Sequence, residues 1–193
     1  MADTVRRRAV VCAVAIAVTA TSCTGPSTSP TTTTPSATAP PITATPLDVA
    51  AHLAEPCAGV PTDLTAQLGL PQRKDAHDTV LVGAGDQSEC RLSSGPPLSA
   101  AAEVRFYAKA RPLPLVTGPG SQIKPTTVAG YPAGEWVLSK GEDGSFTSCQ
   151  VIVDVAPSQG LATLYNGPSS EPVTASCAKA TQLVEGVLTA LRR

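Results

Sequence analysis

A long uncharged run of threonine, serine and proline near the N-terminus is the strongest constraint on how this chain can fold. Between positions 24 and 46, nine Thr, three Ser and six Pro fill 18 of the 23 positions. A segment of this composition has almost no apolar surface to bury, so it cannot offset the conformational entropy lost on ordering. We therefore expect residues 24–46 to be a disordered tether and residues 47–193 to be a single folded domain.

The residues before Cys23 have the pattern of an export signal. Arginines occupy positions 6 to 8, an apolar stretch of 12 residues covers positions 9–20, and small residues follow. A spanning helix needs about 20 apolar residues, so we expect residues 1–22 to be a cleaved signal peptide. The arginine run is also compatible with the twin-arginine route, and the sequence leaves the choice between that route and general secretion open.

Cys23 directly follows Ala20-Thr21-Ser22, and this tetrapeptide resembles the bacterial lipobox, in which a small residue precedes a lipid-modified cysteine. It departs from the usual pattern by having Ala20 in place of leucine. Cleavage before Cys23 would leave five cysteines, an odd number that leaves one thiol unpaired in an oxidising compartment. We therefore expect Cys23 to carry lipid and to anchor the chain to the outer face of the cell membrane. The alternative is a secreted protein with a free or intermolecular Cys23.

The four remaining cysteines are Cys57, Cys90, Cys149 and Cys177, and they can pair in three ways. We favour Cys57–Cys90, which would tie the opening helices to the sheet, and Cys149–Cys177, which would tie a central strand to the terminal helix. Bridges closing loops of this size contribute roughly 3 to 4 kcal/mol each. Metal ligation normally uses closely spaced cysteine pairs, whereas the nearest cysteines here are 28 residues apart, so we expect no metal site.

Apolar periodicity in residues 47–193 predicts an α+β domain. Short helices are expected over 47–53 and 62–68, followed by several strands and a C-terminal helix whose apolar stripe runs from Val173 to Leu191. The expected architecture is an antiparallel sheet packed by the C-terminal helix and the short N-terminal helices, with two disulfides. The expected strands cover residues 87–93, 102–109, 135–138, 147–155 and 161–165, with a turn at 130–132 and a hairpin across 157–160.

Catalytic motifs are absent from the sequence. It contains no nucleophile elbow, no P-loop and no zinc-protease motif. His52 and His77 are the only histidines, and His77 lies in a polar run, 73–78, that we interpret as a surface loop. Gly83-Ala84-Gly85 lacks the third glycine of a dinucleotide fingerprint, and the acidic pair at 142–143 lacks the alternating ligands of a calcium loop. We therefore expect no catalytic residue, no metal and no cofactor.

Aromatic residues make up only 3% of the chain, so we asked of each whether it belongs to the core or to a binding surface. Tyr107, Tyr131 and Trp136 are candidates for a shared binding surface, and Tyr107 falls on the polar face of its expected strand. The alternative is that Trp136 is a core residue. The formal charge of −1 provides no basic field to attract nucleic acid.

With this cysteine layout, the chain resembles actinobacterial envelope lipoproteins of the LprB type, which are built on a domain of unknown function. It departs from their pattern at Leu92, where an aromatic residue is usual. The resemblance implies an envelope lipoprotein with a small α+β domain and no established enzymatic activity. The residues that carry it are Pro56-Cys57, Leu68-Gly69, Cys90, Gly130-Tyr131-Pro132-Ala133, Ser148-Cys149-Gln150-Val151-Ile152-Val153 and Cys177.

These expectations converge on a membrane-anchored, non-catalytic binding or accessory module of the cell envelope. Its expected partner, besides the membrane reached through lipid on Cys23, is another envelope protein, a wall polymer or a small ligand. The alternative is a ligand-sensing or delivery lipoprotein with an internal pocket. An envelope hydrolase ranks last, because the sequence shows no nucleophile–base pair.

Overall fold

The computed structural model describes residues 40–77, 85–97, 99–140 and 147–193. The expected signal peptide, Cys23, the tether up to residue 39 and the acidic turn at 142–143 lie outside the described residues. The helices and strands are η1 Ala50–His52, η2 Pro56–Gly59, α1 Thr62–Gln67, β1 Gln72–Ala76, β2 Gln87–Ser93, β3 Ala101–Tyr107, α2 Pro112–Val116, β4 Lys124–Val128, β5 Tyr131–Lys140, β6 Thr147–Ala156, β7 Gln159–Gly167 and α3 Val173–Leu191.

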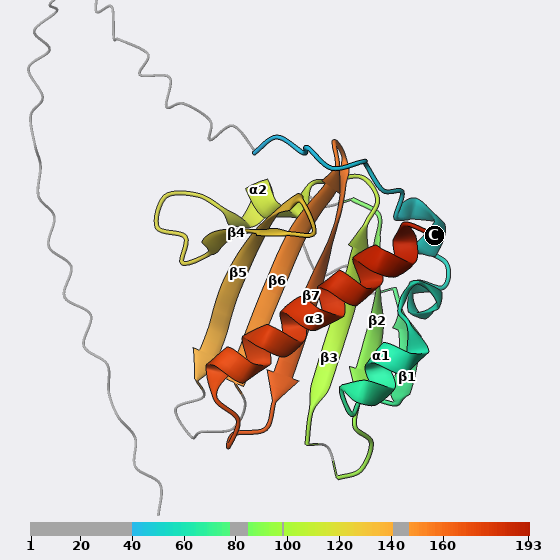
Figure 1. Cartoon of the computed structure of the whole chain (residues 1–193), viewed down its shortest axis with the longest axis vertical. Helices are drawn as coiled ribbons and strands as arrows, with labels where there is room; N and C mark the ends of the chain where they lie inside the picture. The colour runs from blue at the N-terminus through green and yellow to red at the C-terminus, as the bar shows by residue number, and fades with distance from the viewer. Residues whose placement is uncertain (1–39, 78–84, 98, 141–146) are drawn as a thin grey trace, which may run out of the picture. The chain divides into compact units, whose positions relative to one another are not determined.

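The described strands form one antiparallel sheet in the order β1-β2-β3-β7-β6-β5-β4. The helix α3 crosses one face of this sheet diagonally, and α1 and the 3-10 turns lie at the β1–β2 end (Figure 1). The segment containing α2 lies at the other end, beside β4. The predicted α+β architecture, with its C-terminal and short N-terminal helices, is confirmed.

Two tight hairpins follow from local sequence. Val128 pairs with Tyr131, so Ala129 and Gly130 form a two-residue turn with φ angles of 51° and 86°. Positive φ at both central positions belongs to the type I′ turn, which matches the twist of paired strands and which Gly130 adopts without steric cost. Ala156 pairs with Gln159 across the second turn. The second turn falls within the predicted hairpin at 157–160, whereas the first lies one residue earlier than the turn predicted at 130–132, because Tyr131 and Pro132 already pair with β4.

The main core lies between α3 and the sheet. The stripe predicted on α3 is confirmed, because Cys177, Ala180, Val184, Val187 and Leu188 are all buried. Alternate residues of the central strands complete this core, with Phe106, Val153 and Leu161 each 0% exposed. A smaller apolar cluster lies on the opposite face, where the α2 segment packs on the sheet; it contains Tyr107, Leu113, Ile123, Ile152 and Ala162.

Four elements were missed by the sequence analysis: η2, β1, β4 and α2. The run 73–78, interpreted as a loop, instead holds most of the edge strand β1, and His77 after it is exposed. Only Ala76 of β1 and Val128 of β4 are buried, so neither edge strand shows the alternation that reveals a half-buried strand. The short helix α2 contains two prolines, which interrupt any helical pattern.

The domain begins earlier in the chain than predicted. Residues 40–46 were assigned to the tether, but Ile42 and Ala44 pack against the main core. Backbone carbonyls in this segment are also engaged, since Arg111 donates to the Pro40 oxygen at 2.7 Å and the Tyr131 hydroxyl donates to the Thr45 oxygen. These contacts stabilise an extended segment whose own composition would leave it disordered.

Candidate functional site

A pocket of about 510 Å³ lies between α2, β4, the start of β5 and the incoming segment 40–43. We call it the α2 pocket. Its walls are mostly prolines and aliphatic residues, and threonine hydroxyls are the polar side-chain groups. The lining residues are Pro40, Pro41, Thr43, Leu113, Pro114, Thr117, Ile123, Pro125, Thr126, Thr127, Gly130, Pro132 and Ala133.

The α2 segment can reach the sheet because a glycine lies beneath it. A Cβ atom on Gly134 would be 2.4 Å from Ile123 Cγ2 and 2.8 Å from Leu113 Cδ1. Both distances are shorter than van der Waals contact, so a side chain at position 134 would push both pocket-lining residues outward. The absence of a side chain at Gly134 therefore sets how closely one wall of the pocket approaches the sheet.

Asp154 holds α2 in place from below. Its side chain is 0% exposed, and it accepts hydrogen bonds from the Leu113 N–H at 3.1 Å and from Arg111 Nε at 2.8 Å. Arg111 in turn donates to the Pro40 carbonyl. Burial raises the pKa of Asp154, against the opposing effects of the Leu113 N–H and Arg111. A single buried carboxylate thus links β6, α2 and the incoming segment around the pocket.

The residues that line the α2 pocket suit ligand binding and include no group that could act as a catalytic acid or base. None of its lining residues carries an ionisable side chain, so the lining offers neither a general base nor a charged group for a ligand. The Thr117 hydroxyl already donates to the Leu113 carbonyl at 2.9 Å. An uncharged, mainly apolar molecule fits such a lining, because a charged one would lose its hydration without gaining a partner.

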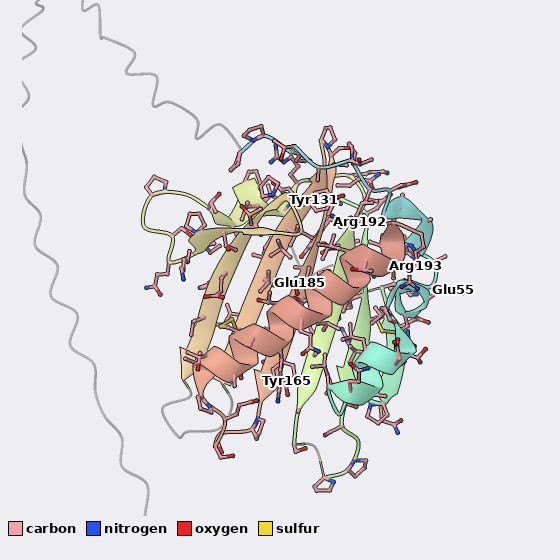
Figure 2. The ribbon with its side chains drawn as sticks, in the orientation of Figure 1. Glu55, Tyr131, Tyr165, Glu185, Arg192 and Arg193 are labelled. Carbon is pink, nitrogen blue, oxygen red and sulfur yellow. A yellow bond between two sulfur atoms is a disulfide. The ribbon has the colours of Figure 1, made fainter. Side chains whose placement is uncertain are left out.

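The three aromatic residues predicted to share a binding surface lie on two opposite faces of the sheet. Tyr131 is 0% exposed and lies on the α3 face, where Arg192 stacks on its ring at 5.3 Å (Figure 2). Tyr107 is 2% exposed and belongs to the cluster on the opposite face. Trp136 is half-buried against that same cluster. The prediction of an exposed Tyr107 was wrong, because the α2 segment covers this face of the sheet.

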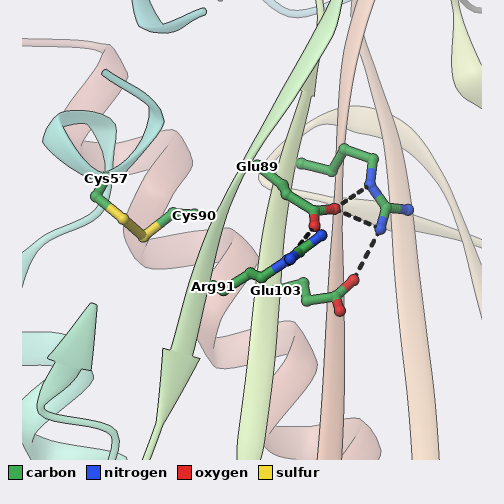
Figure 3. A network of polar contacts seen from close by, with 6 residues as sticks. Cys57, Glu89, Cys90, Arg91 and Glu103 are labelled. Atoms are coloured by element: carbon green, nitrogen blue, oxygen red, sulfur yellow. Dashed lines mark hydrogen bonds and ion pairs between the residues drawn. A yellow bond between two sulfur atoms is a disulfide. The ribbon is translucent and has the colours of Figure 1, made fainter. Parts of the chain in front are cut away.

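The polar face of β2 and β3 carries a network of charges instead of free solvent-facing side chains (Figure 3). Glu89, 1% exposed, accepts from Arg91 Nε at 2.6 Å and from Arg105 Nε at 2.8 Å. Arg105 Nη2 also lies 2.7 Å from Glu103. Burial, followed by repulsion from Glu89, raises the pKa of Glu103. Alternating acidic and basic residues on the two strands are the sequence signal for this network.

Both favoured disulfides are present. Cys57 and Cys90 join η2 to β2, and Cys149 and Cys177 join β6 to α3. Glu135 lies close to the second bridge, and its carboxylate and the two cysteine sulfurs are near enough to one another to resemble a set of metal ligands. The two sulfurs are bonded to each other, so this group offers a metal only the Glu135 carboxylate.

The histidines have no shared site. His52 is half-buried with its ring centroid 5.6 Å from that of Phe106, and His77 is exposed directly after the end of β1. Among the helices of the described residues, none is long and apolar enough to cross a membrane. Sequence reasoning did not identify the α2 pocket, and the only signal for it was the number of prolines in residues 112–132.

Fold and site together define a disulfide-bonded, two-layer α+β domain with an apolar pocket and no charged group in its lining. The chain belongs to the family described as "Protein of unknown function (DUF3558)", whose model matches residues 9–190. No curated protein and no solved structure matched the chain.

Proposed function

We propose that this protein is a lipid-anchored, non-catalytic binding module of the cell envelope that takes a small uncharged ligand in the α2 pocket. The observation that carries the proposal is the pocket of about 510 Å³ without an ionisable lining residue. That volume falls within the range of small-molecule sites. Ligand binding is therefore favoured over a purely protein-docking accessory role, and a hydrolase is disfavoured by the lack of a base in the pocket.

The proposed location rests on the N-terminal sequence and the disulfides. An export signal, a lipobox-like cysteine and a Thr/Ser/Pro tether precede the domain. Two disulfides within the domain are typical of proteins that fold outside the reducing cytosol. The resemblance to LprB-type lipoproteins supports the same location. The tether would then hold the α2 pocket, which the first described residues help to line, away from the membrane surface.

The ligand-binding proposal is tested with an uncharged apolar dye, N-phenylnaphthylamine, and the mature chain carrying Cys23→Ala. Thr126 is exposed on β4 and lines the α2 pocket, so Thr126→Trp should fill the pocket without disturbing the core. We expect this variant to weaken dye binding by about tenfold or more in a fluorescence titration.

The matched control is Gln72→Trp, which places the same side chain at an exposed position on the other edge strand, β1. The control should bind the dye as the parent does. Equal affinity of the Thr126→Trp variant and the parent, with both folded by circular dichroism, would contradict ligand binding in the α2 pocket.

A further inference from the structure

The sheet edge at β5 is only partly covered. The strand β4 pairs with residues 131–135 of β5, from Val128 opposite Tyr131 to Lys124 opposite Glu135. Within the described residues, no strand pairs with the outer side of residues 136–140. An unpaired strand edge presents backbone N–H and C=O groups on which another strand can be built. This half of β5 therefore has room for one short additional strand.

The helix α3 begins close to the edge of β5 that this additional strand would occupy. In Figure 1, the first turns of α3 lie beside the C-terminal end of β5. Between them is a groove of about 480 Å³, which we call the α3 groove. Its β5 side consists of Glu135 and Val137. Its α3 side consists of two adjacent rows of residues one helical turn apart: Val173, Cys177, Thr181 and Glu185, and Thr174, Ala178 and Gln182.

The α3 groove leaves apolar surface open to solvent. Val137 is 44% exposed, one of two large apolar side chains found exposed in the described part of the chain. On the helix side, Val173 and Thr181 are only half-buried. An inserted side chain would bury these groups, because β5 and α3 already form the floor and the roof of the groove.

The charged groups in the α3 groove are acidic. Glu135 is half-buried and Glu185 is exposed, and no ion pair or side-chain hydrogen bond of either carboxylate is found among the described residues. Lys124 lies opposite Glu135 on β4 but makes no ion pair with it in the described structure. A basic side chain entering the groove would therefore meet two carboxylates that form no ion pair among the described residues.

We propose that the α3 groove binds an extended segment of a partner protein that adds as a strand to residues 136–140 of β5. The side chains that this segment directs toward α3 are apolar at the centre, against Val137, and basic at the flanks, near Glu135 and Glu185. Strand addition supplies backbone hydrogen bonds, and the alternate side chains supply selectivity. This proposal is independent of the α2 pocket.

Two features of the edge restrict the partner. The pairing of β5 with β6 shifts register between Val137 and Ser139, so regular backbone pairing is short and the groove-facing side chains must contribute much of the affinity. Pairing of two copies through this edge would bring the acidic residues of both grooves together, and their repulsion disfavours it. A basic segment of a different protein is therefore the occupant that fits.

The test uses fluorescein-labelled peptides and the mature chain carrying Cys23→Ala. The probe Thr-Lys-Thr-Val-Thr-Lys-Thr places a valine between two lysines on one face of a strand. We expect it to bind at least about tenfold more tightly than the same peptide with glutamate in place of lysine, as measured by fluorescence anisotropy. The probe should also slow hydrogen exchange at residues 136–140. A probe with alternate N-methylated peptide bonds should lose this binding.

Matched variants test whether Glu135 and Glu185 attract the lysines of the probe. Glu135→Gln with Glu185→Gln should weaken binding of the lysine probe by about tenfold, with smaller losses at high salt. Glu55→Gln with Asp63→Asn removes two exposed acidic charges elsewhere and should leave the affinity unchanged. Absent binding, equal binding of the glutamate or N-methylated peptide, or equal weakening in the control variant would overturn the proposal. If the protein forms a dimer and Val137→Lys abolishes that dimer, the edge binds a second copy of the chain, and this result would also overturn the proposal.

Discussion

Charged residues on the sheet face opposite α3 illustrate how individual side chains are held in this protein. Glu89 is 1% exposed and contacts both Arg91 and Arg105, and Arg105 reaches Glu103 as well. Buried ion pairs lose much of their Coulomb energy to desolvation, so a network of this kind adds little net stability. Removal of one partner is costly, because the other charge is then left buried without compensation. The network thus specifies how β2 and β3 align.

Glu103 gives this network a pH dependence. Burial and repulsion from Glu89 raise its pKa, so the folded protein holds this proton more tightly than the unfolded chain does. The contribution of Glu103 to stability is therefore greatest in acid and is lost as the pH rises from the ordinary glutamate pKa through the raised one. We expect Glu103→Gln to remove this part of the pH dependence.

The measurement is urea unfolding of the parent and of Glu103→Gln at several pH values across that window. As the pH rises, the free energy of unfolding of the parent should fall relative to that of the Glu103→Gln variant. Glu55→Gln, at an exposed position, is the control for loss of one negative charge. A difference between the Glu103→Gln variant and the parent that stays constant with pH would be inconsistent with the raised pKa.

At the scale of elements, each disulfide links a helical segment to a strand of the sheet. Cys149 on β6 and Cys177 on α3 join the helix layer to the sheet layer. Cys57 and Cys90 join η2 to β2, where Arg73 also donates to the carbonyls of Cys57 and Val60. The chain has few aromatic residues to bury, so these covalent links carry a larger share of its stability than in an average domain.

Removal of the second bridge by Cys149→Ser with Cys177→Ser should lower the free energy of unfolding by about 3 kcal/mol. Hydrogen exchange should quicken mainly in the N-terminal half of α3, because that is where the bridge attaches. The control pair, Cys57→Ser with Cys90→Ser, should give a loss of similar size with faster exchange at η2. The same exchange pattern in both variants would contradict these local roles.

For the molecule as a whole, the proposed organisation is a lipid, a tether and a domain with two separate binding surfaces. The α2 pocket is lined by the start of the domain, and the α3 groove lies along β5 and α3. Glu135, in the groove, and Ala133, in the pocket, are two residues apart on β5. The two surfaces therefore lie next to each other along one strand.

The proposed anchor predicts that Cys23→Ala releases the protein from the membrane fraction of cells or leaves it unprocessed. The physical reason is that a thioether-linked lipid supplies the apolar group that holds the chain to the bilayer. Fractionation and mass measurement of the N-terminus provide the readout. Cys12→Ala is the control, because Cys12 lies in the expected signal peptide and would be removed. Normal processing and retention of the Cys23→Ala protein would refute the anchor.

Local patterns were sufficient for much of the fold. The stripe on α3, the hairpin of β6 and β7 and the turn at Gly130 each depend on residues close in sequence, and each was predicted. The pairing of four cysteines was also predicted, since it required only that the helices lie against the sheet. Edge strands β1 and β4 were missed, because an edge strand can expose most of its residues and leave no periodic pattern.

The sequence by itself determined where low-complexity composition gives way to periodic apolar residues, because composition and period decide whether a segment can bury enough surface of its own to fold. Only the tertiary structure decided where the surfaces lie. Tyr107 is buried because α2 folds back over it, and Asp154 meets Arg111 across 43 positions of sequence. The α2 pocket and the α3 groove depend on strand order, on the short length of β4 and on where α3 crosses the sheet. Those are long-range packing outcomes, which no single stretch of sequence encodes.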